Sequence, residues 1–435
     1  MKLDNVDNLS TNNKFEIILY KEYLKYENLA LEKLILNNNL IKLKDNIYQI
    51  TKEDIEEVFS NDNIELKFYD KIKILSRKIF SKYRGNGIID ILLDMKIDGI
   101  SGGVSGISND KSNIWIFFQG KNVKMSFLVF ESKNELQRIC KNIYRFNTTK
   151  QLSKINGYVV SEMIDGSRVA VARPPFCENY VFFVRKFNLD IKGNINKIVN
   201  NKNLVEFLKY LIFSELVIGI TGDQGCGKTT LLTSLVEFID GRYNIRVHEL
   251  SFELNLRQIY PNRNIVTFRE TDSISGQEAL DFQKKTDGTV SIVGEVASDG
   301  VASSLIQTAM VASKFTLFTH HAKTTKNLVT SIRNSLISTG KFSNEVIATN
   351  QVISVLDIDI HMVKDNYGNR FIERITEITK NTEIITKDII VIENGKYVLK
   401  NLPSKHLDEK IKNNLGEKYR EYKEYISKMS EKYYI

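Results

Sequence analysis

The octapeptide GDQGCGKT at residues 222–229 decides the fold of this 435-residue chain. It matches the pattern G-x-x-x-x-G-K-T, in which glycines let backbone N–H groups converge on phosphate oxygens. The apolar stretch at residues 216–220 leads into it, and a helical pattern with Leu231, Leu232 and Leu235 on one side leads out. A helix that begins at such a loop adds partial positive charge there. The pattern therefore predicts that the chain binds a nucleoside triphosphate.

Particular residues of the loop have predicted roles toward ATP and Mg²⁺. We expect Lys228 to reach the β- and γ-phosphates and the Thr229 hydroxyl to ligate Mg²⁺. The other residues expected around the phosphates are Gly222, Gly225, Cys226, Gly227 and Thr230. We expect Cys226 to serve there only as a small side chain.

A phosphate loop also needs a carboxylate near the metal and the attacking water. The candidate is Glu295, which closes the apolar stretch 289–296, because open α/β sheets place their ligands at the carboxyl ends of the strands. We predict that Glu295 is a general base or orients the water, and that it joins Thr229 in the metal shell. The pattern alone is also compatible with a solvated glutamate at the end of a strand.

Short apolar segments alternate with helical ones after residue 204, which is typical of an α/β domain with a parallel sheet. We expect its strands at residues 216–221, 244–249, 264–269, 289–296 and 315–320. Upstream, residues 14–85 have helical spacing, and their third helix runs from about residue 63 to 83. Residues 86–190 instead contain strand–turn–strand patterns, such as 114–118 with 123–130. We therefore predict the following parts: a helical N-terminal domain (1–85), an α+β domain (86–190), a linker (191–203), an ATPase domain (204–405) and a solvated, charged C-terminal helix (406–435).

The composition narrows the class of protein. Hydrophobic residues make up 42% and charged residues 26% of the chain, which excludes a wholly disordered or fibrous protein. Three cysteines without metal spacing argue against a disulfide framework. The most apolar stretch, 211–220, is too short to span a membrane, and the N-terminus has no apolar secretion signal. We expect a cytoplasmic protein, and its formal net charge of +8 permits contact with phosphate or an acidic membrane without predicting either.

Further motifs flank the phosphate loop in a specific order. They are HELSFEL at 248–254, IVGEV at 292–296, THHAKT at 319–324, DGSRVAVARPPF at 165–176 and RKF at 185–187. Together they resemble the secretion ATPase superfamily of type II and type IV secretion and pilus assembly, and within it the CpaF-type ATPase of Tad/Flp pilus systems. The segments are similar, respectively, to that family's acidic box, second nucleotide motif, histidine box and two N-terminal arginine segments.

The resemblance implies roles for five residues. Glu295 would be the catalytic carboxylate, and Glu249 would orient metal-bound water. His321 would lie beside the nucleotide and sense the γ-phosphate. Arg168 and Arg185 would close over the nucleotide and stabilise the charge of the transferred phosphoryl group. Without the resemblance, His321 would be interpreted as a core or edge histidine and both arginines as solvated surface cations.

The resemblance also implies an architecture and partners. The α/β domain would be a RecA-like motor domain, and six copies would form a homo-hexameric ring. ATP hydrolysis would drive assembly or secretion of pilin-like subunits through an inner-membrane platform protein, with the chain bound peripherally to the cytoplasmic face of the membrane.

The sequence departs from the family at several positions, which leaves two alternatives open. Ala297 stands where an arginine is usual, Gly300 and Leu250 where acidic residues are usual, and 284–286 replaces an arginine-rich segment. Of these departures, Ala297 and Leu250 favour a nucleotide-binding regulatory or scaffold subunit with little turnover. The net charge permits a conjugative or DNA-translocating ATPase, but we identify no basic cluster interleaved with aromatic residues and expect no nucleic-acid partner. The absence of an N/T-K-x-D motif argues against a GTPase.

Overall fold

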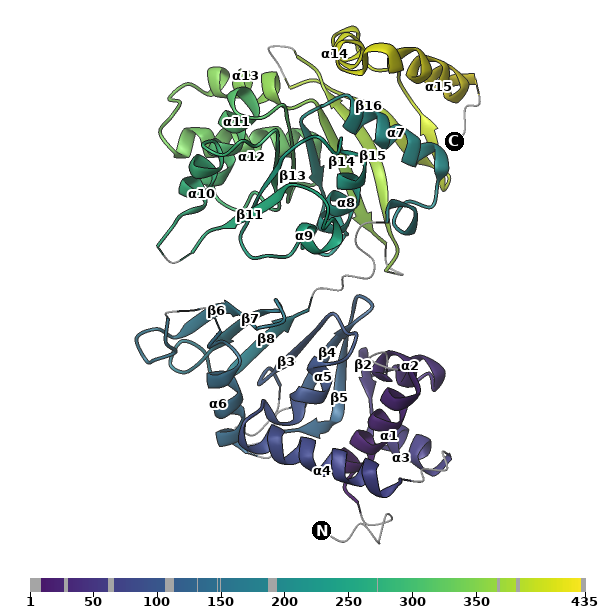
Figure 1. Ribbon diagram of the computed structural model, residues 1–435, viewed down its shortest axis with the longest axis vertical. Helices are drawn as coiled ribbons and strands as arrows, with labels where there is room; N and C mark the ends of the chain where they lie inside the picture. The colour runs from purple at the N-terminus through teal and green to yellow at the C-terminus, as the bar shows by residue number, and fades with distance from the viewer. Residues whose placement is uncertain are drawn as a thin grey trace. The chain divides into compact units, whose positions relative to one another are not determined.

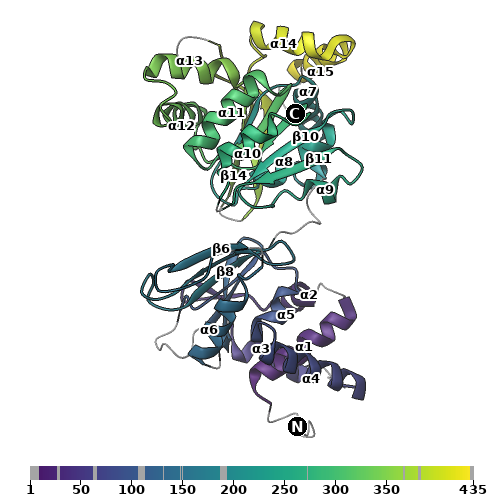
Figure 2. The same cartoon turned by 60° about the vertical axis from the view of Figure 1, so that its left-hand side comes forward.

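The computed structural model describes residues 9–26, 30–61, 66–105, 113–130, 132–146, 148, 150–186, 194–271, 273–365, 368–380 and 384–431. The chain consists of two compact units, Met1–Asn188 and Leu189–Ile435 (Figures 1 and 2). Each unit is described by itself. Among the described helices, none combines the length and the apolar character that crossing a lipid bilayer requires.

The first unit is built around one mixed sheet with the strand order β1-β2-β5-β4-β3-β8-β7-β6. Its strands are β1 (Lys42–Lys44), β2 (Ile47–Ile50), β3 (Gly99–Gly102), β4 (Asn113–Phe118), β5 (Lys121–Val129), β6 (Tyr158–Glu162), β7 (Arg168–Ala172) and β8 (Val181–Arg185). Its helices are α1 (Thr11–Tyr26), α2 (Ala30–Asn37), α3 (Lys52–Asn61), α4 (Phe68–Tyr83), α5 (Asp90–Leu93) and α6 (Lys133–Asn142), with a short 3₁₀ turn η2 (Gly87–Ile89). The predicted hairpin is present as β4 and β5. Helix α4 is the predicted third helix, whose expected first residues lie partly outside the described residues.

The helical segment and the strands of this unit share one hydrophobic core. Phe15 of α1 packs edge-on against Phe127 of β5, with ring centroids 4.9 Å apart, and Ile55 of α3 is fully buried in the same cluster. Strand β2 also pairs in parallel with β5. Short amphipathic helices gain stability by packing their apolar faces against another element. The sequence placed a domain boundary at residue 85, whereas the structure joins the segments on both sides of it.

The second unit contains a nine-stranded sheet in the order β11-β10-β12-β13-β9-β14-β15-β16-β17. Its strands are β9 (Ile218–Thr221), β10 (Ile245–Glu249), β11 (Ile265–Arg269), β12 (Val290–Val293), β13 (Phe315–His320), β14 (Ile358–Lys364), β15 (Arg370–Ile378), β16 (Thr386–Glu393) and β17 (Lys396–Leu399). Strands β9 to β14 pair in parallel, and the last three add antiparallel pairs. All five predicted strands are present, which confirms the predicted α/β class.

Helices cover both faces of this sheet. They are α7 (Lys202–Phe213), α8 (Lys228–Leu235), α9 (Leu256–Ile259), α10 (Gly276–Gln283), α11 (Asp299–Val311), α12 (Thr325–Ser338), α13 (Glu345–Val355), α14 (Lys405–Leu415) and α15 (Tyr419–Glu431), with 3₁₀ turns η3 (Ile195–Lys197), η4 (Val236–Phe238) and η5 (Gly416–Lys418). One core contains side chains of α7, α8, α14 and α15, and the other contains side chains of α10 to α13. The strands contribute alternate residues to the two cores, as with Leu317 and Phe318 of β13.

Two predictions at the ends of this unit need correction. Ile195 and Val199, in the predicted linker 191–203, are buried in the core beneath α7, while residues 191–193 lie outside the described residues. The predicted solvated C-terminal helix is two helices, α14 and α15, separated at Gly416 with φ 55°. Their charged residues surround an apolar side that includes Ile411 and Tyr422, which are each 1% exposed. Both helices pack against the core of the second unit through this apolar side.

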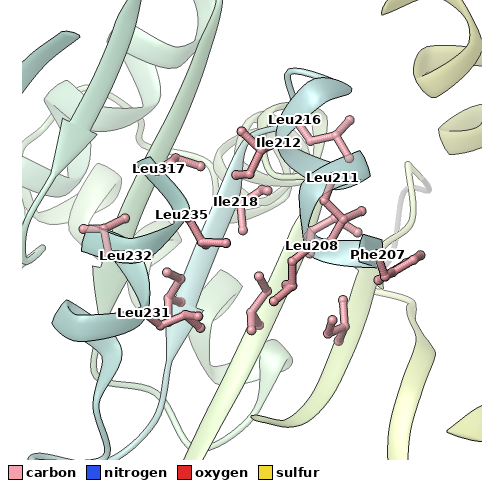
Figure 3. Packing of buried hydrophobic residues seen from close by; sticks show 14 of the residues in the cluster. Phe207, Leu208, Leu211, Ile212, Leu216, Ile218, Leu231, Leu232, Leu235 and Leu317 are labelled. Carbon is pink, nitrogen blue, oxygen red and sulfur yellow. The ribbon is translucent and has the colours of Figure 1, made fainter. Parts of the chain in front are cut away.

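The core beneath the phosphate loop fixes the start of α8. Figure 3 shows Leu231, Leu232 and Leu235 of α8 on the same side of the sheet as side chains of α7, close to Ile218 of β9. These leucines and Ile218 are fully buried. Burial of each such side chain stabilises the fold by about 1.5–3 kcal/mol. The helix that carries the loop is therefore held rigidly against the strand that leads into it.

Candidate active site

The phosphate loop connects β9 to α8 and depends on glycine at three positions. The φ angles of Gly222, Gly225 and Gly227 are 137°, 76° and 99°, in a region that L side chains rarely adopt. A Cβ atom on Gly222 would lie 2.1 Å from the carbonyl oxygen of Met362 on β14 and 2.8 Å from Sγ of Cys226. Cys226 is fully buried, and burial raises the pKa of its thiol. The loop is thus packed closely against the sheet, and Cys226 fills space in it.

The charged amino group of Lys228 lies against the backbone of the loop. Its Nζ donates to the carbonyl oxygens of Gly222 and Asp223, both at 2.9 Å, and lies 3.3 Å from Nδ1 of His321. Lys228 is only 6% exposed, so these contacts compensate the cost of burying an ammonium group. An ammonium group has three donors and no acceptor. Nδ1 of His321 therefore accepts from Lys228.

His321 connects Lys228 to Glu295. With Nδ1 as an acceptor, a neutral imidazole carries its proton on Nε2. That nitrogen lies 3.2 Å from Oε1 of Glu295. The side chains of His321 and Glu295 are 46% and 38% exposed, so both remain accessible from solvent. The structure brings together three of the predicted site residues in one continuous row.

The backbone around Glu295 is fixed by both neighbouring strands. Strand β12 ends at Val293, earlier than predicted, because the chain turns to pair with each side: Gly294 N–H donates to His248 O at 2.8 Å, and Val296 N–H donates to Thr319 O at 3.0 Å. The Thr319 hydroxyl also donates to Gly294 O at 2.5 Å. Glu295 therefore lies two residues beyond the strand, on a backbone segment with little freedom.

Glu249 lies at the same edge of the sheet as Glu295. It is the last residue of β10 and is 3% exposed, and a Cβ on Gly294 would lie 3.0 Å from its Cγ. Its Oε1 accepts from the N–H groups of Glu253 and Leu254, at 2.9 and 2.7 Å. One carboxylate oxygen of Glu249 thus stabilises the turn that follows β10. Its role toward metal-bound water stays a prediction.

The residues at this edge fit a magnesium ion bound together with phosphate. Thr229 and Thr230 are half-buried at the start of α8. In the described part of the chain, no group of three or more His, Cys, Asp or Glu side chains could hold a metal ion. Mg²⁺ needs few protein ligands because it keeps several waters and takes oxygens from substrate phosphates. Thr229 with one carboxylate, as predicted for Glu295, is a sufficient protein contribution.

A buried polar network beneath the loop was missed in the sequence. The hydroxyls of Thr221 and Thr325 donate to the two carboxylate oxygens of Asp359, each at 2.6 Å, and Thr221 Oγ1 lies 2.8 Å from Nδ1 of His361. Burial raises the pKa of Asp359, and burial with the nearby charge of Arg374 lowers the pKa of His361 to about 4. The network ties β9, β14 and the start of α12 together. The sequence pattern that could have revealed this network is the alternation of Asp359 and His361 with apolar residues in one strand.

Arg168 and Arg185 belong to the first unit. They lie on β7 and β8 and are direct partners in the antiparallel register. Side chains opposite each other in such a pair project from the same face of the sheet. The structure therefore brings the two predicted arginines side by side, although 16 residues separate them in the chain.

A model of the Type II/IV secretion system protein family matches residues 105–381. The chain is similar to the VirB11 ATPase from the Brucella suis type IV secretion system (17% identity; 65% of this chain and 89% of that chain covered; TM-score 0.37). It is also similar to the Legionella pneumophila ATPase DotB (14%; 80% and 87%; 0.48) and to the pilus retraction motor PilT with bound ADP (14%; 85% and 95%; 0.49). No curated protein matches it.

The matched region includes Arg168 and Arg185 of the first unit. It also includes the residues described above in the second unit, from Thr221 in β9 to Arg374 in β15. It covers well over half of the chain, and it confirms the RecA-like fold predicted for the second unit. The chain belongs to the Type II/IV secretion system protein family, within the secretion ATPase superfamily that its motifs predicted.

Proposed function

We propose that this chain is an ATP-hydrolysing motor that drives assembly or secretion of pilin-like subunits through a membrane platform protein. The observation that carries the proposal is the row Lys228–His321–Glu295 at the carboxyl edge of the sheet. It links the phosphate-binding cation to a solvent-accessible carboxylate through one imidazole. Such an arrangement suits phosphoryl transfer, in which catalysis depends mainly on positioning and electrostatic stabilisation.

Each residue has a distinct role in this proposal. Backbone N–H groups of the loop, the N-terminus of α8 and Lys228 bind the phosphates of ATP. Thr229 and Glu295 hold Mg²⁺, which neutralises charge on the phosphates when it is bound. Glu295 orients the attacking water or accepts its proton, with Glu249 in support. His321 contacts both Lys228 and Glu295, so a change at the γ-phosphate reaches the carboxylate through it.

The wider assembly is part of the same proposal. Arg168 and Arg185 supply cationic stabilisation of the transferred phosphoryl group, which their pairing on β7 and β8 supports. Six copies form a ring of the Tad/Flp type that acts at the cytoplasmic face of the membrane. A closed ring suits a motor because one repeated interface lets each nucleotide bias its neighbour.

The test is ATP turnover of Glu295→Gln against the parent protein. We expect turnover to fall by roughly 10²–10⁴-fold, because the amide cannot accept a proton, while ATP binding is retained. Glu345→Gln, a change at an exposed residue at the start of α13, is the matched control and should leave turnover unchanged. Equal turnover of Glu295→Gln and the parent would overturn the assignment.

A second candidate is a nucleotide-binding regulatory or scaffold subunit with little turnover. Ala297 and Leu250, which stand at positions where the family usually has charged residues, favour it. Phosphate release from the parent protein separates the two candidates. If the parent binds ATP but releases no phosphate, whether or not lipid vesicles are present, the result would support the regulatory or scaffold subunit.

A further inference from the structure

Helix α4 of the first unit packs with its polar side against the protein. Lys78 forms an ion pair with Glu16 at 2.8 Å, and Arg77 forms one with Asp94. Arg138 of α6 donates to the backbone carbonyl oxygen of Ser81 at 3.3 Å. No residue of α4 is fully buried. An ordinary surface helix does the reverse and buries its apolar side.

The apolar side of α4 faces solvent. Seven large apolar side chains are exposed there: Phe68 (79%), Tyr69 (64%), Ile72 (44%), Leu75 (46%), Ile79 (52%), Phe80 (61%) and Tyr83 (74%). Positions 68, 72, 75, 79 and 83 recur at intervals of three and four, so they form one stripe along a helix of roughly 24 Å. A continuous exposed apolar stripe of this kind marks an interaction surface.

The order of residues along the stripe distinguishes its two ends from its middle. Aromatic side chains lie at both ends, and the aliphatic Ile72, Leu75 and Ile79 lie between them. Aromatic rings favour the boundary between lipid and water, whereas aliphatic chains favour the hydrocarbon beneath it.

The segment that carries this stripe has many more basic than acidic residues. Residues 67–84 contain seven Lys and Arg residues and a single acidic residue, Asp70. Lys73 and Lys82 are exposed next to the stripe, and Nζ of Lys73 lies 4.7 Å from the centroid of the Tyr69 ring. Long cationic side chains of this kind can lie along apolar surface and keep their charge in water.

This charge pattern favours an anionic lipid surface over a protein partner. Protein–protein interfaces are depleted in Lys, whereas anionic lipid headgroups attract it. Single-stranded nucleic acid also binds basic and aromatic side chains, and residues 67–84 do combine the two, contrary to our reading of the sequence. The aliphatic middle of the stripe, however, offers bases no stacking surface.

We infer that α4 lies in the plane of an anionic membrane surface, with its apolar stripe at the boundary between headgroups and acyl chains and its lysines among the headgroups. This inference deepens the membrane location within the proposed function. It depends on no step of ATP hydrolysis.

The test is flotation of the full-length protein with vesicles of phosphatidylglycerol and phosphatidylcholine, compared with vesicles of phosphatidylcholine alone. We expect binding to the anionic vesicles only, weakened by added salt. The double variant Ile79→Ser/Phe80→Ser should bind them roughly tenfold or more weakly, because both side chains lose buried apolar area. The variant Ile155→Ser/Ile164→Ser is the matched control, because these residues are 95% and 84% exposed in the same unit away from α4, and it should bind as the parent does.

Several results would overturn the inference. They are no binding of the parent to anionic vesicles, equal binding of the α4 variant, displacement of vesicles by single-stranded DNA, or a lipid-free dimer that the α4 variant abolishes. The Lys228→Ala variant separates this inference from the proposed function. It should bind vesicles normally even though it is expected to lose ATP binding.

Discussion

Helices α8 and α4 have similar apolar spacing and opposite surroundings. In α8, Leu231, Leu232 and Leu235 are fully buried beneath the sheet of the second unit. In α4, the apolar side is exposed, and ion pairs of Arg77 and Lys78 hold its polar side. The comparison shows that apolar periodicity predicts a helix and an apolar face, but not what covers that face.

The largest expected effect comes from shortening one leucine in each helix. Leu232→Ala should lower the free energy of unfolding of the second unit by about 2–5 kcal/mol, because it leaves a cavity in a packed core. Leu75→Ala should change that of the first unit by less than about 0.5 kcal/mol, because Leu75 is 46% exposed.

Urea denaturation measures both changes. The only tryptophan, Trp115, lies on β4, so its fluorescence follows the first unit, whereas circular dichroism follows both units. A loss of several kcal/mol in Leu75→Ala would show that the apolar side of α4 is covered by protein, and would remove the contrast between the helices.

A second difference between the units is their response to acid. All five histidines lie in the second unit, and burial lowers the pKa of the fully buried His248 to about 4. Neither ring nitrogen of His248 has a hydrogen-bond partner among the described residues. Between about pH 6.5 and 4, His248 is therefore protonated in the unfolded state and neutral in the folded state. The second unit loses stability as the pH falls through that range.

The variant His248→Leu tests this response. Between about pH 7 and 5, the parent's second unit should lose about 2 kcal/mol more stability than the variant's. The transition reported by Trp115 should show no such difference between the two proteins. Equal pH dependence of the second unit in both proteins would contradict a neutral, buried His248.

The smallest expected effect concerns the ion pairs that hold α4. The side chains of Lys78 and Glu16 are 32% and 20% exposed, and partly solvated pairs contribute about 0–1 kcal/mol. Lys78→Ala should therefore lower the stability of the first unit, followed by Trp115 fluorescence, by no more than about 1 kcal/mol. Lys67→Ala, at an exposed residue just before α4, is the control. A loss above 3 kcal/mol, on the order of that for a buried pair, would show that α4 is more deeply packed than its exposure indicates.

Local patterns in the sequence were sufficient for the phosphate loop and the five parallel strands. Gly222, Gly227 and Lys228 are specified by backbone conformation and charge within eight residues, so their spacing alone reveals them. The position of Glu295 at the carboxyl edge of the sheet could be predicted because this residue follows an apolar stretch. His321 required the family resemblance, because a single histidine after a strand has no distinctive pattern of its own.

Contacts between distant parts of the chain were not predictable in this way. The buried network joins Thr221 to Thr325 and Asp359, which both lie more than a hundred positions further along the chain. The domain boundary expected at residue 85 similarly failed to anticipate the pairing of β2 with β5, which brings Ile50 beside Met125. Periodicity shows which side of a strand is apolar, but the partner strand is selected by the fold as a whole.

The most direct test of the account is ATP binding and hydrolysis by Lys228→Ala, with Lys209→Ala on α7 as the control. Lys228 makes its contacts within the phosphate loop and with His321, whereas Lys209 pairs with Glu206 in its own helix. We predict that Lys228→Ala loses both binding and phosphate release while remaining folded, and that Lys209→Ala keeps both. Normal binding and hydrolysis by Lys228→Ala would contradict the assignment of this site.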